Sequence, residues 1–424
     1  MTGKKRAYFG ATVALASAAA LTPPAHAADP IKIGVLLSLT GNFAENGQQT
    51  LTGIKMYLDE IHSKAGGRDL ELVVEDTQSK PDVAVSKARK EVERDGVAVL
   101  SGIVSSGEAL AVNDYARGAK VPLVLSGDAG VDEVTMPGPL ANPYLVRTSQ
   151  NGRTVAAAGA DWAYKKGWRK IVTIGSDYAG GVDTNFSFAQ AFCKAGGKII
   201  QENWPPVGTA DFGPYLTNLD RSADAVEMFE PGADGLRLGK QYSEFGLKGK
   251  LPVMDIYGTI VYEPNQAQLG DAVLGMYSSL FYSPYVKNAE NEKFVPEFKK
   301  RMNGTAPANE GPNGWVGMHA IADAITALKG DVSDSLKFVA ALKEVHFDSP
   351  KGPIKLDKYG MVIQTMYIRE AEKVDGGIGN VPIASYPDVD QFWPFSEGDF
   401  ASLKASYKES KDQLTDCDKL LAKK

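Results

Sequence analysis

The feature that most limits the fold of this chain is an alternation, from Asp29 onward, of short β-branched runs with stretches of helical periodicity. After the first run, for example, Leu51, Ile54, Leu58 and Ile61 recur at the spacing of one helix face. Such alternation is typical of parallel sheets covered by helices on both faces. The first strands are predicted at Ile31–Leu37, Leu70–Glu75, Val97–Ile103 and Val121–Leu125.

A second series of the same kind begins after a run at Tyr144–Arg147. Its predicted strands are Ile171–Gly175, Lys198–Gln201, Ala225–Phe229 and Pro252–Ile256. Its predicted helices are Val155–Lys166, Asn185–Lys194, Phe212–Asp220 and Leu236–Phe245. Two series of similar size predict two α/β lobes, which also suits a chain of 424 residues.

The last third of the chain changes character, with few predicted strands and helices at Glu292–Met302, Gly314–Lys329 and Ser333–Glu344. Too few strands are expected there to build a third sheet. We therefore expect these helices to return and cover the first lobe. The charged segment from Asp399 onward is expected to form a final helix on the surface.

The first 27 residues have the pattern of an export signal. Lys4, Lys5 and Arg6 precede an apolar run of small residues from Ala7 to Leu21, and Ala25-His26-Ala27 is a small-x-small cleavage pattern. A membrane anchor is the alternative, but the run is shorter than the roughly 20 residues that a spanning helix needs. No cysteine stands directly after the cleavage site, so we expect a soluble periplasmic protein that begins at Ala28.

Charge and cysteine content narrow the classes of partner. Removal of the signal leaves 43 basic and 52 acidic residues, a net charge of −9, which disfavours nucleic acid and anionic membrane as partners. Cys193 and Cys417 could form one disulfide in an oxidising compartment. Two separate buried thiols are the alternative, and the spacing leaves both open.

The loop from Ser38 to Gly47 joins the first strand to the first helix. In open parallel sheets, ligands bind beyond the carboxyl ends of the strands, where such loops lead into helix starts. Its glycines let the backbone turn tightly. We expect this loop to form one wall of a cleft.

The opening "IKIGVLLSLTG" and "GQQTLTGIKMYLDEI" resembles the start of the branched-chain amino acid class of periplasmic solute-binding proteins, which deliver ligands to ABC importers. The segments "GIVSSGEALAV", "VPLVLSG", "YLVRT", "GSDYAGGVD" and "GPNGWVGMHAIADAITAL" follow in the order that this family has them. The resemblance covers nearly the whole mature chain. Each segment alone is only moderately specific for this family. The evidence for the resemblance is that all of them occur in the family's order.

The resemblance implies the type I periplasmic binding protein fold, in which two Rossmann-like, doubly wound α/β lobes are joined by three crossing strands. Here the crossings would fall near Arg147, Ser279 and Leu356. Lobe 1 would then comprise residues 28–147 and 280–356, lobe 2 would comprise 148–279 and 357–398, and 399–424 would form a helical tail. Both cysteines would lie on or near one lobe, which favours a bridge.

The resemblance also implies where the first lobe holds a ligand. Ser105 and Ser106 stand at a predicted helix start, where backbone N–H groups and the helix dipole suit a carboxylate. Helix capping without a ligand is the alternative. Ser126 opens the "SGDAG" loop of Asp128, Ala129 and Gly130, where the family grips the polar head of its ligand. Gly130 replaces the usual hydroxyl-bearing residue, which leaves backbone contacts, and Asp128 would either bind an amine or stabilise the turn.

In the second lobe, Tyr178 matches a tyrosine of the family that faces the cleft, although a surface tyrosine in a loop is the alternative. Family members that bind leucine-like amino acids tend to carry a glutamate where Tyr257 stands here. Because a buried ammonium without a carboxylate is costly by several kcal/mol, Asp255, Glu230 or Asp128 would have to substitute. If none of these carboxylates substitutes, the ligand is expected to lack an ammonium group. Asn46 also stands where many members have an aromatic residue.

The predicted function is therefore the solute-binding subunit of an ABC importer, with no cofactor, no metal and a permease and an ATPase as partners. Its ligand would be a small carboxylate such as a branched-chain or related hydrophobic amino acid. The alternatives are an amine-free aromatic or aliphatic acid, or a sensory module that reports to a receptor. An enzyme is disfavoured, since the first strand is followed by neither G-x-G-x-x-G nor G-x-x-x-x-G-K-[ST], and His62, His319 and His346 lie singly. We expect a monomer.

Overall fold

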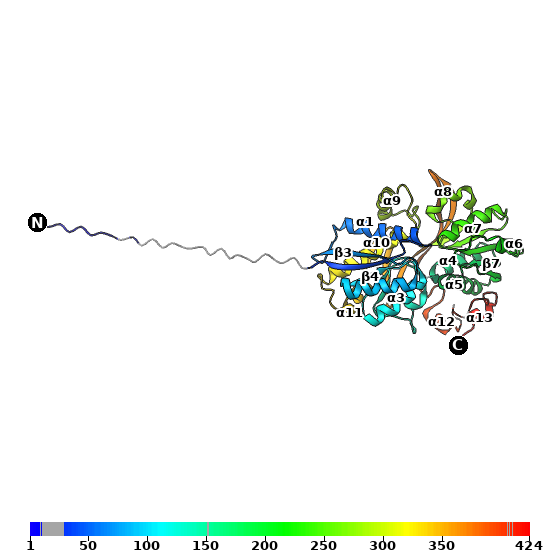
Figure 1. Cartoon of the computed structure of the whole chain (residues 1–424), viewed down its shortest axis with the longest axis horizontal. Coiled ribbons are helices and arrows are strands. Elements are labelled where there is room, and N and C mark those ends of the chain that lie inside the picture. The colour runs from blue at the N-terminus through cyan, green and yellow to red at the C-terminus, as the bar shows by residue number, and fades with distance from the viewer. Residues whose placement is uncertain (9, 11–28, 151, 405, 407, 409) are drawn as a thin grey trace.

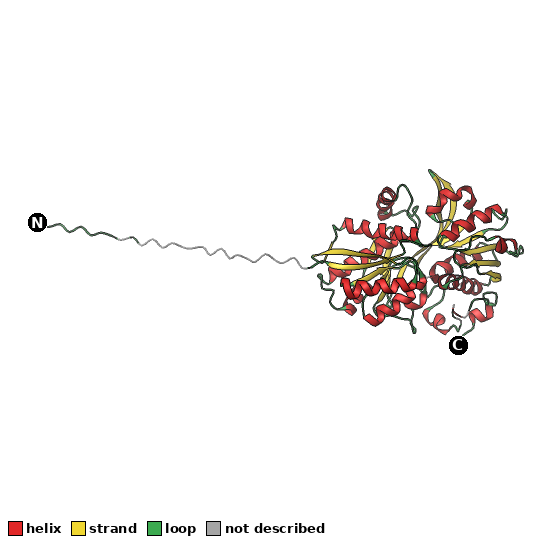
Figure 2. Cartoon of the chain, viewed as in Figure 1, coloured by secondary structure: helices red, strands yellow, loops and turns green. Residues whose placement is uncertain are grey.

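The computed structural model describes residues 1–8, 10, 29–150, 152–404, 406, 408 and 410–424. Most of the predicted export signal lies outside this range. The described residues form two lobes that lie side by side along the long axis of the molecule (Figure 1). Each lobe is a sheet with helices packed on it (Figure 2). In this described part, no helix combines the length and the hydropathy that a membrane crossing requires.

The first lobe contains, among the described residues, a six-stranded sheet in the order β2-β3-β1-β4-β5-β6. It is parallel except for the short β2, which pairs antiparallel with β3. The strands are β1 (Ile31–Leu37), β2 (Lys64–Ala65), β3 (Arg68–Asp76), β4 (Val99–Gly102), β5 (Leu123–Leu125) and β6 (Leu145–Arg147). The predicted strands of the first series are confirmed, with β4 and β5 shorter than expected.

Helices cover both faces of this sheet. One face carries α1 (Ala44–Glu60), whose Ile54 shares a core with Ile33 of β1. The other carries α2 (Pro81–Lys90) and α3 (Ser106–Ala119), whose Ala88 and Val112 share a separate core with Leu100 of β4. The first turns of α1 and α3 therefore reach the carboxyl edge of the sheet from opposite faces (Figure 1).

The second lobe is built on a sheet in the order β12-β13-β14-β11-β10-β9-β7-β8, with β15 beside β14. The strands of this sheet are β7 (Lys170–Gly175), β8 (Lys198–Asn203), β9 (Ala225–Phe229), β10 (Val253–Ile256), β11 (Tyr277–Leu280), β12 (His346–Ser349), β13 (Gly352–Leu356), β14 (Val362–Val374) and β15 (Gly377–Val389). Of these, β12 and β13 lie against the first lobe, because Phe347 and Ile354 pack in its core. The helices of the second lobe are α4 (Gly152–Lys165), α5 (Ala179–Ala195), α6 (Gly213–Thr217), α7 (Ala233–Glu244) and α8 (Gln266–Leu269). The predicted second α/β unit is confirmed.

The later helices do return to the first lobe, as expected. They are α9 (Ala289–Arg301), α10 (Glu310–Ala327) and α11 (Ser335–Lys343). Trp315 and Phe298 join the core that contains Ile33. Glycines let α10 lie directly against α1, because a Cβ on Gly53 would be 1.8 Å from the carbonyl oxygen of Gly311.

The expectation of few strands in the last third was wrong. β14 and β15 are 13 residues each and form a long antiparallel hairpin across the two-residue turn Asp375–Gly376. These strands add to the second sheet and build no third one. Along β14, Val362 belongs to the core of the first lobe and Met366 to a core of the second, so this strand passes between the lobes. The exact lobe boundaries stay a prediction.

The end of the chain also differs from the single surface helix expected from Asp399 onward. Its described residues contain two short helices, α12 (Glu397–Ser402) and α13 (Cys417–Leu421). Cys417 is disulfide-bonded to Cys193 of α5, which resolves the alternative that the sequence left open. The bridge, together with Leu414 and Leu420 buried in a core of the second lobe, holds this segment against α5.

Candidate ligand-binding site

A pocket lies between the lobes, beyond the carboxyl ends of the strands of both sheets. It has an empty volume of about 400 Å³, part of which is open to solvent. Loops and helix starts of both lobes supply its lining: Phe43, Asn46, Val104, Ser106, Asp128, Gly130, Tyr178, Gly180, Thr184, Phe229, Pro231, Tyr257 and Thr259. The expectation that the Ser38–Gly47 loop forms a cleft wall is confirmed, because Phe43 and Asn46 belong to the lining.

Aromatic rings make up much of the wall. Tyr178 lies nearly parallel to Phe229, with ring centroids 6.4 Å apart, and Phe229 lies 5.4 Å from Tyr257. Phe43 of the first lobe approaches Tyr178 of the second, at 6.5 Å between centroids. These separations lie within the range of favourable aromatic pairs. The site therefore offers flat apolar surfaces from both lobes.

Two helix N-termini meet at one side of the pocket. Ser106 is the first residue of α3, and Gly180 lies in the first turn of α5. The two come so close that a Cβ on Gly180 would be 2.8 Å from Ser106 Oγ. Because helix N-termini carry unsatisfied N–H groups and partial positive charge, this side suits an anion such as a carboxylate.

Gly130 and Tyr257 face each other beside Ser106. The N–H of Gly130 donates to Ser106 Oγ at 3.1 Å, and a Cβ on Gly130 would be 3.2 Å from the hydroxyl of Tyr257. Among the described residues, this buried hydroxyl has no hydrogen-bond partner. Tyr257 has φ of 67°, in the left-handed region that non-glycine residues rarely adopt. A strained residue with an unpartnered polar atom is a common feature of ligand sites.

Asp128 and Asn46 form an acidic, hydrogen-bonded side of the pocket. Asp128 Oδ1 accepts from Gln150 Nε2 at 2.6 Å and from Asn309 Nδ2 at 2.7 Å. Burial raises the pKa of Asp128 to about 6. Asn46 Nδ2 donates to Glu310 Oε1, and burial together with the charge of Asp128 raises the pKa of Glu310 well above its usual range.

Five of the predicted site residues line the pocket, namely Ser106, Asp128, Gly130, Tyr178 and Tyr257. Three others lie behind it. The N–H of Ser105 donates to Glu108 Oε2 in a capping box of α3. Ser126 Oγ is bonded to Ser101 Oγ and accepts from the N–H of Gly102, and the carbonyl of Ala129 accepts from Arg147. Ser105 thus caps α3, and its contact with a ligand stays a prediction.

Asp255 and Glu230 also lie outside the lining. Asp255 Oδ1 accepts from the N–H and the hydroxyl of Thr259, and Oδ2 accepts from the N–H groups of Ile260 and Val261, all at 2.8 to 2.9 Å. This carboxylate holds the loop after β10 and has no oxygen left for a ligand. Glu230 is fully buried, and burial raises its pKa well above the usual range. Both carboxyl groups lie outside the pocket lining, and a role for either toward a ligand ammonium stays a prediction.

Sequence reasoning missed several lining residues. Phe43, Pro231 and Thr259 lie in loops next to strands and helices, Phe229 is the last residue of β9, and Thr184 lies within α5. Phe43 stands inside the loop that was expected to form a wall. Phe229 ends a predicted strand, so its position at the carboxyl edge was a usable signal.

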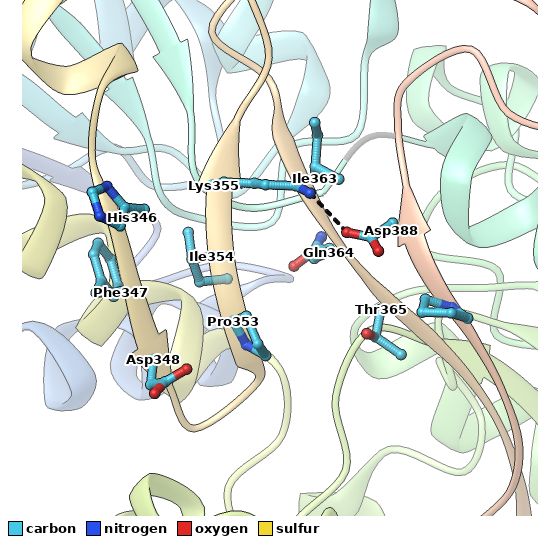
Figure 3. Close-up of a pocket in the computed structure, with 11 residues that line it drawn as sticks. His346, Phe347, Asp348, Pro353, Ile354, Lys355, Ile363, Gln364, Thr365 and Asp388 are labelled. Carbon is cyan, nitrogen blue, oxygen red and sulfur yellow. Dashed lines mark hydrogen bonds and ion pairs between the residues drawn. The ribbon is translucent and has the colours of Figure 1, made fainter.

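A larger groove lies elsewhere, along β12 to β15 (Figure 3). Its side chains project from neighbouring strands, and Lys355 Nζ lies 2.8 Å from Asp388 Oδ1. Both of these side chains are more than half exposed. The groove has neither helix N-termini nor the facing aromatic rings of the inter-lobe pocket, so the pocket between the lobes is the stronger candidate site. In the described part of the chain, no group of His, Cys, Asp or Glu side chains is placed to hold a metal ion.

The family model of the periplasmic binding proteins matches residues 30–377. The chain belongs to this family. A Leu/Ile/Val-binding protein homolog 6 from Brucella suis biovar 1 is 33% identical over 356 residues, which cover 82% of this chain and 90% of the relative. The predicted resemblance to leucine-binding-like, type I periplasmic binding proteins of ABC transporters is thereby confirmed.

Solved structures support the same assignment. An ABC transporter substrate-binding protein from Sphaerobacter thermophilus has a TM-score of 0.81 and 36% identity, and covers 86% of this chain and 99% of its own. A solute-binding protein of an ABC transporter from Rhodopseudomonas palustris BisB5, in complex with 3,4-dihydroxybenzoic acid, has a TM-score of 0.81, 32% identity and the same coverage. As a periplasmic binding protein, this chain is an extracytoplasmic substrate-binding component that works with permease and ATPase components.

Proposed function

We propose that this protein captures an amine-free aromatic carboxylate between its closing lobes for import by an ABC transporter. The observation that carries the proposal is the pocket lining, where four aromatic side chains, Phe43, Tyr178, Phe229 and Tyr257, surround an anion site at the starts of α3 and α5. A ring that slots between these walls would place its carboxylate at Ser106, Gly180 and the hydroxyl of Tyr257. Charge-assisted hydrogen bonds of this kind are the strong ones.

The absence of a suitable partner for an ammonium supports an amine-free ligand. Asp255 uses both of its oxygens on the loop after β10, and Glu230 lies outside the lining. Asp128 is the carboxyl group of the lining, and Gln150 and Asn309 already donate to it. The solved relative that holds 3,4-dihydroxybenzoic acid gives independent support for this ligand class.

A branched-chain or related hydrophobic amino acid is the second candidate, and Asp128 is the observation that favours it. Its carboxyl group belongs to the lining and, with a pKa of about 6, is ionised at neutral pH. It would have to accept an ammonium in addition to its two present donors. The names of the Brucella relatives favour the same class.

The test is calorimetric titration of the mature protein, stripped of ligand by unfolding and refolding. Matched pairs isolate the amine: leucine against 4-methylpentanoate, and phenylalanine against 3-phenylpropanoate, with benzoate alongside. We expect binding of benzoate or 3-phenylpropanoate and none of leucine. Micromolar binding, about −8 kcal/mol, is a reasonable strength for one charged group and one buried ring. Binding of leucine or valine without binding of any aromatic acid would overturn the proposal.

Export, monomeric state and lack of catalysis belong to the same proposal. The protein would be cleaved after Ala27, act in the periplasm as a monomer and release its ligand chemically unchanged. Intact mass of the periplasmic fraction tests the cleavage site, and recovery of the ligand after unfolding tests the absence of turnover. A ligand recovered as a different compound would contradict the transport role.

A further inference from the structure

One side of the pocket holds a polar atom that the carboxylate site does not use. Asn46 lies in the first turn of α1, is 6% exposed and belongs to the lining. Its Nδ2 donates to Glu310, which fixes the amide, while its Oδ1 has no hydrogen-bond partner among the described residues. A buried acceptor without a donor is costly, so a bound ligand that supplies one would bind more tightly.

This acceptor and Ser106 of the anion site come from helices that pack on opposite faces of the first sheet. Asn46 enters from α1, whose core is shared with Ile33 and Trp315 on one face of the first sheet. Ser106 enters from α3, whose core lies on the other face. A ligand whose carboxylate is held at Ser106 would therefore direct its opposite end toward the α1 side of the pocket, where Asn46 lies. The α-ammonium of an amino acid stays beside its carboxylate and would not reach that end.

The surroundings of Asn46 favour a hydrogen-bond donor over an anion or an alkyl group. The charge of Asp128, which belongs to the lining on this side, would repel a second carboxylate. An alkyl group would leave Asn46 Oδ1 unpaired. A ring hydroxyl supplies a neutral O–H donor at the far end of a flat molecule.

We propose that Asn46 is a specificity-determining residue that accepts a hydrogen bond from a ring hydroxyl, which narrows the substrate class to hydroxylated aromatic acids. This inference rests on the proposed function, since it needs the carboxylate at Ser106 and the ring between the aromatic walls. It adds a second recognition point, contributed by the first lobe at the far side of the pocket.

The test compares ligands of nearly equal size that differ in the donor. The affinities of 3- and 4-hydroxybenzoate are measured by calorimetry against those of 3- and 4-methylbenzoate. We expect the better hydroxylated isomer to bind wild-type protein at least about tenfold more tightly than its methyl counterpart. In Asn46→Leu the ratio should fall to about one. The readout is this ratio within each protein, so a change in overall affinity does not disturb it.

Thr50→Val is the matched control. Thr50 is buried one turn further along α1, outside the lining, and its hydroxyl donates to the carbonyl of Asn46. This variant removes a hydrogen bond from the same helix and should keep the wild-type ratio. The wild-type comparison alone needs no variant to fold.

The outcomes separate the two proposals. Failure of all the aromatic acids to bind would overturn the proposed function. Binding of hydroxylated and methylated acids with equal affinity would overturn this inference and leave the function standing. A preference for the hydroxyl that persists in Asn46→Leu would overturn the role of Asn46.

Discussion

Replacement of Tyr257 by Phe tests the anion site most directly, because it removes one oxygen and keeps the ring against Phe229. The Tyr257 hydroxyl is buried and has no partner among the described residues, so the substitution removes no hydrogen bond seen within the protein. A hydrogen bond to a charged group contributes about 1.5–3 kcal/mol. Since about 1.4 kcal/mol corresponds to a factor of ten, benzoate should bind Tyr257→Phe roughly 10- to 150-fold more weakly.

The stability of the ligand-free protein should respond differently. We expect Tyr257→Phe to change the free energy of unfolding by less than about 0.5 kcal/mol. Tyr242→Phe is the matched control, because its buried hydroxyl donates to the carbonyl of Leu251 at 2.6 Å, far from the pocket. That variant should lose about 1 kcal/mol of stability and keep its affinity. Titration calorimetry and urea unfolding measure the two effects, and wild-type affinity in Tyr257→Phe would refute the reasoning.

Four further predictions concern the same site and the fold around it. Gly130→Ala places a Cβ 3.2 Å from the Tyr257 hydroxyl and should weaken benzoate binding, with a smaller loss in the Tyr257→Phe background, as a double-mutant cycle by calorimetry would reveal. Asp255→Asn puts amide hydrogens against N–H donors and should cost about 3 kcal/mol or more of unfolding free energy in urea titrations, without creating or removing a preference for amines. Benzoate affinity should rise as the pH falls from 7.5 to 5.5, because Asp128, with a pKa of about 6, loses the charge that repels the ligand carboxylate. Calorimetry should give a smaller pH dependence for Asp128→Asn, in which Lys351, with a pKa lowered to about 7 by burial, still titrates, whereas an amine ligand would give the opposite slope in the wild-type protein. Reduction of the Cys193–Cys417 disulfide should expose the C-terminal segment to limited proteolysis while benzoate affinity stays at its wild-type value.

Strand positions were predictable where both faces of a strand are buried. Ile31–Leu37 and Ala225–Phe229 were expected with the bounds that the structure has, since mainly apolar runs, each with one charged residue (Lys32 and Glu227), stand between polar segments. The hairpin of β14 and β15 was missed because its exposed half mixes charged residues such as Glu370 and Lys373 with apolar ones. Its turn, Asp375–Gly376, is nevertheless a common hairpin signal, so this error was avoidable.

The site was predictable at the level of loops and less so at the level of atoms. The resemblance to the binding-protein family gave Ser106, Asp128 and Tyr257 as candidates, and all three belong to the lining. The sequence could not reveal that both carboxylate oxygens of Asp255 accept hydrogen bonds from Thr259, Ile260 and Val261. These bonds depend on the backbone path after β10. Because of this arrangement, Asp255 has no free oxygen to accept a ligand ammonium.

The groups left unpartnered at the pocket give a reason why closure should depend on the ligand. With the lobes in contact at Phe43 and Tyr178, the hydroxyl of Tyr257 and Oδ1 of Asn46 are buried without partners. Each such group costs about 1–3 kcal/mol, so empty closure is opposed by roughly 2–6 kcal/mol. An open form lets water bond both groups, and a ligand with a carboxylate at one end and a hydroxyl at the other bonds both in the closed form.

A ligand can shift the equilibrium between the open and closed forms only by its differential affinity for the two forms. A ligand that lacks the carboxylate or the hydroxyl should therefore bind but leave a larger fraction of the protein in the open form. The fraction of closed protein at saturating ligand would then report how well a ligand satisfies both groups.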